Sequence, residues 1–155
     1  KIYRIQVAKM EALPNIPILL RDIMKTPVIT LDENASVLNA AKLMAKNDIG
    51  CIVVVNGKGE VCGILSERDI IKILGIKGFV GSLKVKDIMS KNVYCMREGN
   101  TIVEALRVML ERKIRHLPIV DSENKLKGIV SLRDVASKVF TNLMTILSYV
   151  ISRKT

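Results

Sequence analysis

Apolar residues recur along the chain with two spacings, one typical of helices and one of strands. Two segments have apolar residues at i, i+3, i+4 and i+7, which predicts an amphipathic helix in each: Val37, Ala40, Ala41 and Met44, and Ile102, Ala105, Leu106 and Met109. Mainly apolar runs joined by short polar turns predict two β-hairpins: residues 51–55 and 61–65, and residues 116–120 and 126–130. Short extended stretches are expected ahead of the helices, at 28–31 and 93–96.

These elements arise from an internal repeat. Residues 22–71 align without a gap on residues 87–136 when the chain is shifted by 65 positions, and fourteen positions are identical. In the first copy they are Asp22, Ile23, Met24, Val28, Glu33, Ala40, Met44, Ile49, Val55, Gly63, Ile64, Ser66, Arg68 and Asp69. One supersecondary unit is therefore used twice.

Each unit is predicted to run strand, helix, strand, strand, helix, so the fold class is α/β (α+β). A half-sheet with helices on one face cannot close a core alone, so we expect the two units to pack around a pseudo-two-fold axis. The predicted organisation is an N-terminal segment at 1–19, repeat 1 at 20–80, repeat 2 at 81–140 and a C-terminal helix extension at 141–155. Because the sequence begins with Lys1 rather than Met, we also expect residues ahead of it.

Composition indicates a folded and basic protein. Of the 155 residues, 49% are hydrophobic and 26% are charged, and the formal net charge is +10. A basic surface attracts polyanions such as nucleic acid, anionic lipid and phosphorylated small molecules. Residues 70–86 and 135–155 contain lysine or arginine and no acidic residue, so nucleic-acid binding is one hypothesis. Aromatic residues, which stack on bases, make up only 3% of the chain, which weighs against it.

The heptads GILSERD at 63–69 and GIVSLRD at 128–134 are the most distinctive part of the repeat. Serine followed three residues later by aspartate is a helix N-capping arrangement, and glycine allows another backbone to approach, so a purely structural explanation exists. The same geometry suits a nucleotide, because the N–H groups and the hydroxyl can donate to phosphate and the carboxylate can accept ribose hydroxyls. Arg68 and Arg133 would neutralise phosphate charge, which capping alone does not explain.

The repeat resembles a tandem pair of CBS (cystathionine β-synthase) domains, known as a Bateman module. The resemblance covers roughly residues 20–140 and is carried by DIM at 22–24 and 87–89, by IGCIVVVN at 49–56, by IRHLPIVD at 114–121 and by the two heptads. It implies a regulatory module that binds an adenosine-containing ligand (AMP, ADP or ATP, with S-adenosylmethionine possible) in two clefts between the repeats and signals to a partner protein.

The resemblance also implies which residues form each cleft. The heptad aspartate would hold the ribose, and the serine and arginine would approach the phosphates. The opposite repeat would enclose the adenine. One cleft would use Ser131, Arg133 and Asp134 with Val28, Ile49 and Gly50, and the other would use Ser66, Arg68 and Asp69 with Val93, Ile114 and Arg115. The alternative for the four aliphatic residues is plain core packing. Because Gly50 carries no charge where Arg115 does, the two clefts should differ in phosphate affinity.

Little in the sequence points to catalysis or to a metal. It contains no nucleophile elbow, glycine-rich phosphate loop or Cys/His cluster with metal-ligand spacing, so we expect a protein that is not an enzyme. Cys51, Cys62 and Cys95 are expected to be reduced thiols in a cytoplasmic protein. His116 is expected to be a polar residue at a strand start rather than a general base.

The C-terminal stretch predicts self-association. Residues 139–151 carry no charge and place an apolar stripe at helical spacing, formed by Phe140, Leu143, Met144, Leu147 and Val150. Such a stripe is unfavourable on a monomer, so we expect a homodimer, as the family resemblance also implies. The stretch is too short and too interrupted by polar residues to predict a membrane span. A structural dimerisation unit with empty clefts remains a further alternative.

Overall fold

The computed structural model describes residues 16–153, so residues 1–15 of the predicted N-terminal segment and residues 154–155 lie outside the described part. Each repeat has the predicted order of elements. Repeat 1 comprises the short 3-10 helix η1 (Leu20–Asp22), β1 (Thr30–Asp32), α1 (Val37–Asn47), β2 (Cys51–Val55), β3 (Val61–Ser66) and α2 (Glu67–Lys77). Repeat 2 comprises α3 (Val85–Ile88), β4 (Met96–Arg97), α4 (Ile102–Arg112), β5 (His116–Val120), β6 (Leu126–Ser131) and α5 (Leu132–Ser152).

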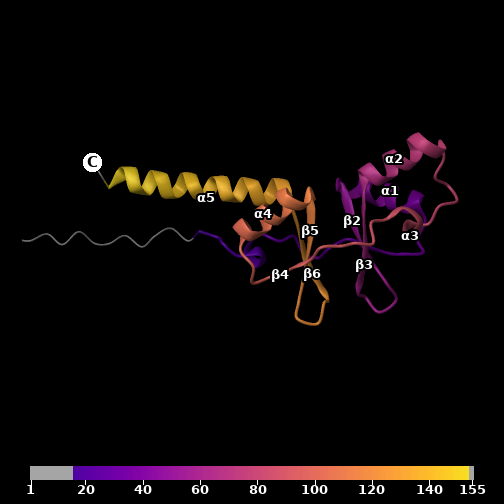
Figure 1. Ribbon diagram of the computed structural model, residues 1–155, viewed down its shortest axis with the longest axis horizontal. Helices are drawn as coiled ribbons and strands as arrows, with labels where there is room; N and C mark the ends of the chain where they lie inside the picture. Colours follow the sequence, from indigo (N-terminus) through magenta and orange to yellow (C-terminus); the bar gives the residue numbers. More distant parts are fainter. Residues whose placement is uncertain (1–15, 154–155) are drawn as a thin grey trace, which may run out of the picture.

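The α/β fold is confirmed, with two three-stranded sheets of equivalent topology. In each sheet the first strand is parallel to the middle strand, which pairs antiparallel with the third. Strands β1 and β4 are shorter and begin later than predicted, because only three and two residues respectively pair with their neighbours. The sheets lie next to each other at the centre of the molecule (Figure 1).

Hairpin register places each heptad serine beside the start of the middle strand. Ser66 pairs with Cys51, and Ser131 pairs with His116. The N-terminus of the helix after the hairpin therefore lies at the same end of the sheet as the residues that precede the middle strand. The register thus brings two separate motifs of each repeat to one end of its sheet.

The leading segments of the two repeats are exchanged between the cores. Leu20, which is fully buried, packs in the core of repeat 2, and Val85 and Met89 pack in the core of repeat 1. The exchange is fixed by backbone hydrogen bonds, since Lys25 N–H donates to Ile129 O at 2.9 Å. Neither core is complete without a segment of the other repeat.

Bridges between the repeats follow the predicted pseudo-two-fold symmetry. The isolated bridge between Lys25 and Ile129 has a counterpart, shifted by 65 residues at both partners, between Ser90 and Ile64. A further bridge joins Glu60 to Lys125, two residues that are themselves 65 apart. That bridge is its own counterpart and therefore lies on the pseudo-axis, where the two hairpin turns meet.

The exchange explains the heptad glycines. A Cβ built on Gly63 would collide with the Sδ of Met89, and one built on Gly128 would collide with Met24. The backbone of the other repeat's leading segment does run beside these glycines, since it is hydrogen-bonded to the next residues, Ile64 and Ile129, and a methionine side chain of that segment fills the space at each glycine. The DIM motif and the heptad glycine are two halves of one packing contact.

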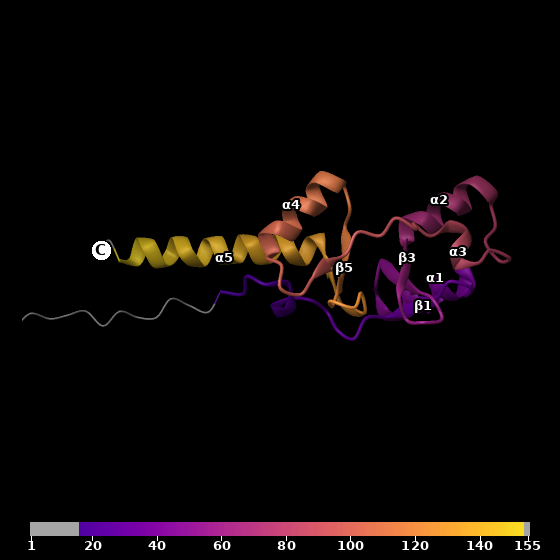
Figure 2. The ribbon, with the colours of Figure 1, turned by 60° about the horizontal axis from the view of Figure 1, so that its bottom comes forward.

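Helix α5 extends well beyond its repeat. In Figure 1 and Figure 2 it leaves repeat 2 in the direction away from repeat 1. Val135 is buried against the core, but the outer half exposes the whole predicted apolar stripe, Phe140, Leu143, Met144, Leu147 and Val150. Among the described residues, α5 is the one helix long and apolar enough to cross a membrane, by length and composition alone.

Candidate functional site

Both heptad serines cap the helices that follow, as the structural explanation requires. Ser66 Oγ donates to Asp69 Oδ2 at 2.6 Å, and Ser131 Oγ donates to Asp134 Oδ2 at 2.7 Å. Each serine oxygen also accepts the backbone N–H of its aspartate, at 3.4 and 3.1 Å. In each case the hydrogen bonds use one carboxylate oxygen, and Oδ1 takes no hydrogen bond from the described residues. Capping therefore leaves half of each carboxylate open.

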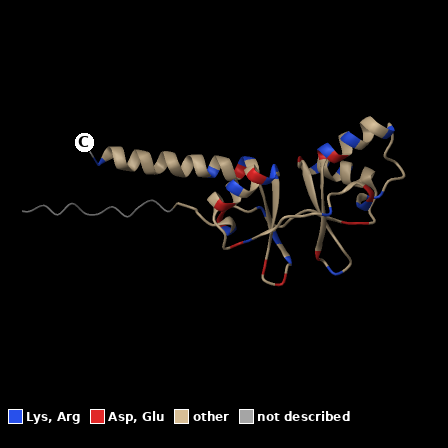
Figure 3. Cartoon of the chain, in the orientation of Figure 1, with Lys and Arg blue, Asp and Glu red and all other residues tan. Residues whose placement is uncertain are grey.

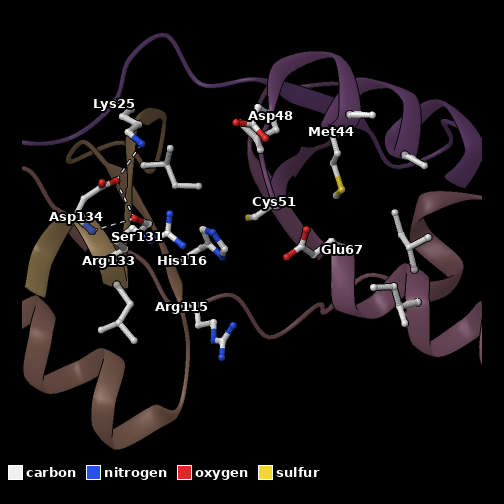
Figure 4. Close-up of a pocket in the computed structure, with 18 of the residues that line it drawn as sticks. Lys25, Met44, Asp48, Cys51, Glu67, Arg115, His116, Ser131, Arg133 and Asp134 are labelled. Carbon is white, nitrogen blue, oxygen red and sulfur yellow. Dashed lines mark hydrogen bonds and ion pairs between the residues drawn. The ribbon is translucent and has the colours of Figure 1, made fainter.

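The larger cavity, here the Asp134 cavity, has a volume of about 870 Å³ and lies between the repeats (Figure 4). Repeat 2 contributes the heptad residues Ser131, Arg133 and Asp134, and repeat 1 contributes Ile49 and Gly50. Five of the six residues predicted for this cleft therefore line one cavity. The sixth, Val28, is not part of its lining.

The smaller cavity, here the Asp69 cavity, has a volume of about 300 Å³. All six residues predicted for this cleft line it, namely Ser66, Arg68, Asp69, Val93, Ile114 and Arg115. The pseudo-two-fold axis thus generates two clefts, each with a heptad from one repeat and a strand approach from the other.

The alternative of plain core packing holds only in part for the aliphatic residues. Val28, Ile49, Val93 and Ile114 are all half-buried rather than buried. Ile49 and Ile114 touch the cores of their own repeats and also line a cavity, so one side of each is available to a ligand.

Lys25 is a site residue that the sequence did not reveal. Its Nζ lies 3.1 Å from Asp134 Oδ2, and it lines the Asp134 cavity (Figure 4). The lysine belongs to repeat 1 and reaches repeat 2 only because the leading segments are exchanged. Its counterpart is Ser90, so the repeat pattern itself carries no signal for this ion pair.

Electrostatics differ between the titratable groups of the clefts. Burial disfavours the charged form of Asp134, but hydrogen bonds from Ser131 and Lys25 and the nearby positive charges outweigh it, so the pKa of Asp134 is lowered. For His116, burial disfavours the charged imidazolium and lowers the pKa, so the side chain is neutral at pH 7. Burial and the charge of Asp69 raise the pKa of Cys51 to about 12, which keeps its thiol protonated and unreactive.

The described residues hold no group of three or more His, Cys, Asp or Glu side chains suited to a metal ion. The chemistry around both cavities is instead hydroxyls, carboxylates, guanidinium groups and apolar walls. These groups recognise ligands through hydrogen bonds and charge. Chemically, the arrangement is suited to holding a ligand.

Comparison with known proteins agrees with this geometry. The model of the CBS domain family matches the chain twice, over residues 20–76 and 85–140. The CBS domain-containing protein YhcV of Bacillus subtilis is 35% identical over 123 residues, which cover 79% of this chain and 86% of YhcV. The match extends over both repeats.

Solved structures of similar proteins share the whole fold. The CBS-domain containing protein ATU1752 from Agrobacterium tumefaciens superposes with a TM-score of 0.75 at 26% identity, covering 83% of this chain and 98% of that one. The CBS domain pair of protein MJ0100, in complex with 5'-methylthioadenosine and S-adenosyl-L-methionine, has a TM-score of 0.73 at 30% identity over 81% of this chain and 98% of that one. The chain belongs to the CBS domain family and carries two CBS domains that form a pair.

Proposed function

We propose that the protein is a regulatory module that binds adenosine-containing ligands in the Asp134 and Asp69 cavities. The observation that carries the proposal is the placement of both heptads, each with serine, arginine and aspartate at a cavity wall completed by the other repeat. A similar CBS domain pair, that of MJ0100, has been solved with S-adenosyl-L-methionine and 5'-methylthioadenosine. AMP, ADP and ATP are the other members of the proposed ligand class.

Each side chain has a chemical task in this proposal. The open Oδ1 of Asp69 or Asp134 accepts ribose hydroxyls, and the arginine before it attracts a phosphate. The helix N-terminus adds its free N–H groups and the positive end of its dipole. Because each cavity is built from both repeats, a bound ligand contacts both at once and can favour one relative arrangement. A partner protein that recognises this arrangement would then receive the signal.

Calorimetric titration of the purified protein with AMP, ADP, ATP and S-adenosylmethionine tests the proposal. At least one ligand is expected to bind, with up to two molecules per chain. The absorbance spectrum of freshly purified protein gives an independent check, since a chain with no Trp and three Tyr absorbs weakly and bound adenine shifts the maximum toward 260 nm. Failure of every adenosine compound to bind, together with tight binding of RNA or DNA, would favour the nucleic-acid hypothesis instead.

The distribution of charge along the described residues weighs against nucleic acid. Figure 3 shows basic and acidic segments interspersed over both repeats, and neither sign along the outer part of α5 before its end. Binding of polyanions usually requires a basic patch or stripe. A phosphate-bearing adenosine ligand is therefore the better hypothesis for the anion that this basic protein, with its net charge of +10, attracts.

We further propose a homodimer in the cytoplasm, in which α5 packs against a second copy. The stripe residues have no charge among them and are all exposed, which suits association with an equally apolar partner. A membrane span is less favourable, because a span of about 20 residues would take up nearly all of α5, whose first turn carries Arg133 and Asp134 of the cavity. Sedimentation of Leu147→Glu is expected to give a monomer. The control Thr145→Glu, on the polar side, should sediment like the parent.

A further inference from the structure

The two cavities share a wall. Five residues of the described part of the chain line both of them, namely Gly50, Cys51, Glu67, Arg115 and His116. Gly50 and Arg115 occupy equivalent positions of the two repeats, and so do Cys51 and His116. The wall thus lies where the starts of β2 and β5 face each other across the pseudo-axis.

Backbone structure in the wall is symmetric. Glu67 N–H donates to Gly50 O at 2.9 Å, and at the equivalent position Leu132 N–H donates to Arg115 O at 2.8 Å. Both hydrogen bonds attach the first residue of the helix to the residue that precedes the middle strand. Two ligands bound in the two cavities therefore approach the wall from equivalent directions.

Charge in the wall is not symmetric. Repeat 1 supplies the Glu67 carboxylate and repeat 2 the Arg115 guanidinium, whereas their counterparts Leu132 and Gly50 are uncharged. A Cβ on Gly50 would lie 3.3 Å from the Glu67 Cδ, so the carboxylate lies over the glycine. With His116 neutral, the wall has one cation and one anion at pH 7.

Among the described residues, Arg115 is the one cation that lines both cavities. The Asp134 cavity has Lys25 and Arg133 of its own, and the Asp69 cavity has Arg68 and Lys113 of its own. Arg115 is exposed and forms no ion pair with the described residues. Figure 4 shows its side chain and that of Glu67 in the space between the repeats.

We propose that Arg115 is a shared phosphate-binding residue and that it makes the two cavities bind phosphate-bearing ligands anticooperatively. The inference rests on the proposed adenosine-binding function. A phosphate in one cavity attracts the guanidinium, so a second phosphate in the other cavity finds less positive charge and also meets the repulsion of the first. A ligand without phosphate, such as adenosine, does not engage Arg115 and leaves the cavities independent.

Calorimetry with AMP and with adenosine tests the coupling. Asp69→Asn weakens one cavity and Asp134→Asn the other, so each variant reports AMP binding by a single cavity with its neighbour empty. In the parent, the second AMP should bind about tenfold more weakly than AMP binds to the same cavity in the single-cavity variant. The loss of one hydrogen bond to a charged group reduces affinity by about this factor. Adenosine should show no such difference.

Arg115→Gln separates coupling from a mere difference between the cavities. This variant should weaken the first AMP, and each of its cavities should then bind AMP as it does in Arg115→Gln/Asp69→Asn or Arg115→Gln/Asp134→Asn, where the neighbouring cavity is empty. The matched control Arg107→Gln removes the same charge from α4 at a residue outside both cavity linings and should retain the parent behaviour. If a cavity binds AMP only in the variant whose other cavity is disabled, the anticooperativity is so strong that the parent binds a single AMP, and the proposal is supported.

Three outcomes overturn the inference. The parent can bind its second AMP as tightly as the single-cavity variants do, Arg115→Gln can keep the difference, or AMP can stay confined to one cavity in every variant. Each leaves the proposed function intact as long as adenosine compounds bind. If neither adenosine nor AMP binds the parent, the proposed function itself fails, and the coupling fails with it.

Discussion

The two repeats have the same heptad but place it in different surroundings. Asp69 accepts both the hydroxyl and the backbone N–H of Ser66, the latter at 2.8 Å, so its bonds are local. Asp134 accepts the hydroxyl of Ser131 and the ammonium group of Lys25 from the other repeat. The residues that determine the fold and the charged heptad residues are repeated, whereas the charge of Lys25 has no counterpart in the other cleft. The two clefts are therefore related in shape and different in electrostatics.

The hydrophobic cores of the two repeats differ in how deeply one methionine is buried, and this difference should affect stability. Met89 is buried in the core of repeat 1, whereas its counterpart Met24 is only half-buried against the core of repeat 2. Both methionines come from the exchanged leading segments. The same motif should therefore contribute more to one repeat than to the other.

Truncation of these methionines should have the largest effect on stability. Met89→Ala is expected to lower the free energy of unfolding by about 2–5 kcal/mol, the usual cost of removing a buried methionine. Met24→Ala should cost less because part of its side chain is exposed. Urea denaturation of both variants measures the difference. Equal and small losses in the two would contradict the exchanged packing.

Adding a methyl group at the heptad glycines should have the next largest effect. Gly63→Ala and Gly128→Ala each introduce a Cβ where a methionine Sδ lies, and overpacking of this kind costs about 1–3 kcal/mol. Gly57→Ala is the control, because its Cβ would meet no atom within 4 Å. The double variant Gly63→Ala/Met89→Ala should be less destabilised than the sum of the two single variants. Strict additivity in that double variant would contradict contact between the two residues.

The sequence predicted the secondary structure elements of each repeat, but it did not predict which residues of the two repeats contact each other. The repeat, the order of elements and the capping serines follow from local patterns, because helix periodicity and caps are set by residues close in sequence. The exchange joins Met24 to Gly128 and Lys25 to Asp134, pairs more than 100 positions apart. A three-residue motif is too short to show a periodicity, so the sequence does not indicate which core it packs in. These contacts could be identified only from the three-dimensional structure.

For the clefts, too, the sequence predicted some of the lining residues and missed others. Eleven of the twelve residues that the family resemblance implied line at least one of the two cavities, because the heptads and strand starts lie at one end of each sheet. Val28 does not, and Lys25 and Glu67 were missed because their counterparts Ser90 and Leu132 lack charge. An internal repeat identifies the positions that both copies share. Charges that belong to one cleft lie at positions where the two copies differ, so the repeat does not identify them.

Removal of the Lys25–Asp134 ion pair should have the smallest effect. The Lys25 side chain is largely exposed, so Lys25→Met should reduce stability at pH 7 by no more than about 1 kcal/mol. The pKa of Asp134 is lowered in the folded state, so this stabilisation is present above the unfolded pKa and is lost as the pH falls through the folded pKa. Denaturation at several pH values should show parent and variant converging in acid. A constant difference down to that range would contradict the assignment.

Calorimetry of the double variant Asp69→Asn/Asp134→Asn tests the central claim most directly. Asparagine still caps a helix, so the variant should stay folded, with each cap changed by at most about 1 kcal/mol. Each cleft loses its charged acceptor for ribose, so affinity for the adenosine ligand should fall about tenfold to a hundredfold per cleft.

Asp121→Asn is the matched control. It removes one charge in a hairpin turn, where the counterpart Asn56 already accepts the equivalent backbone N–H groups, and it should bind like the parent. The account predicts near-complete loss of adenosine-ligand binding in the folded double variant and none in the control. Binding by the double variant as tight as that of the parent would contradict it and reduce both heptads to helix caps.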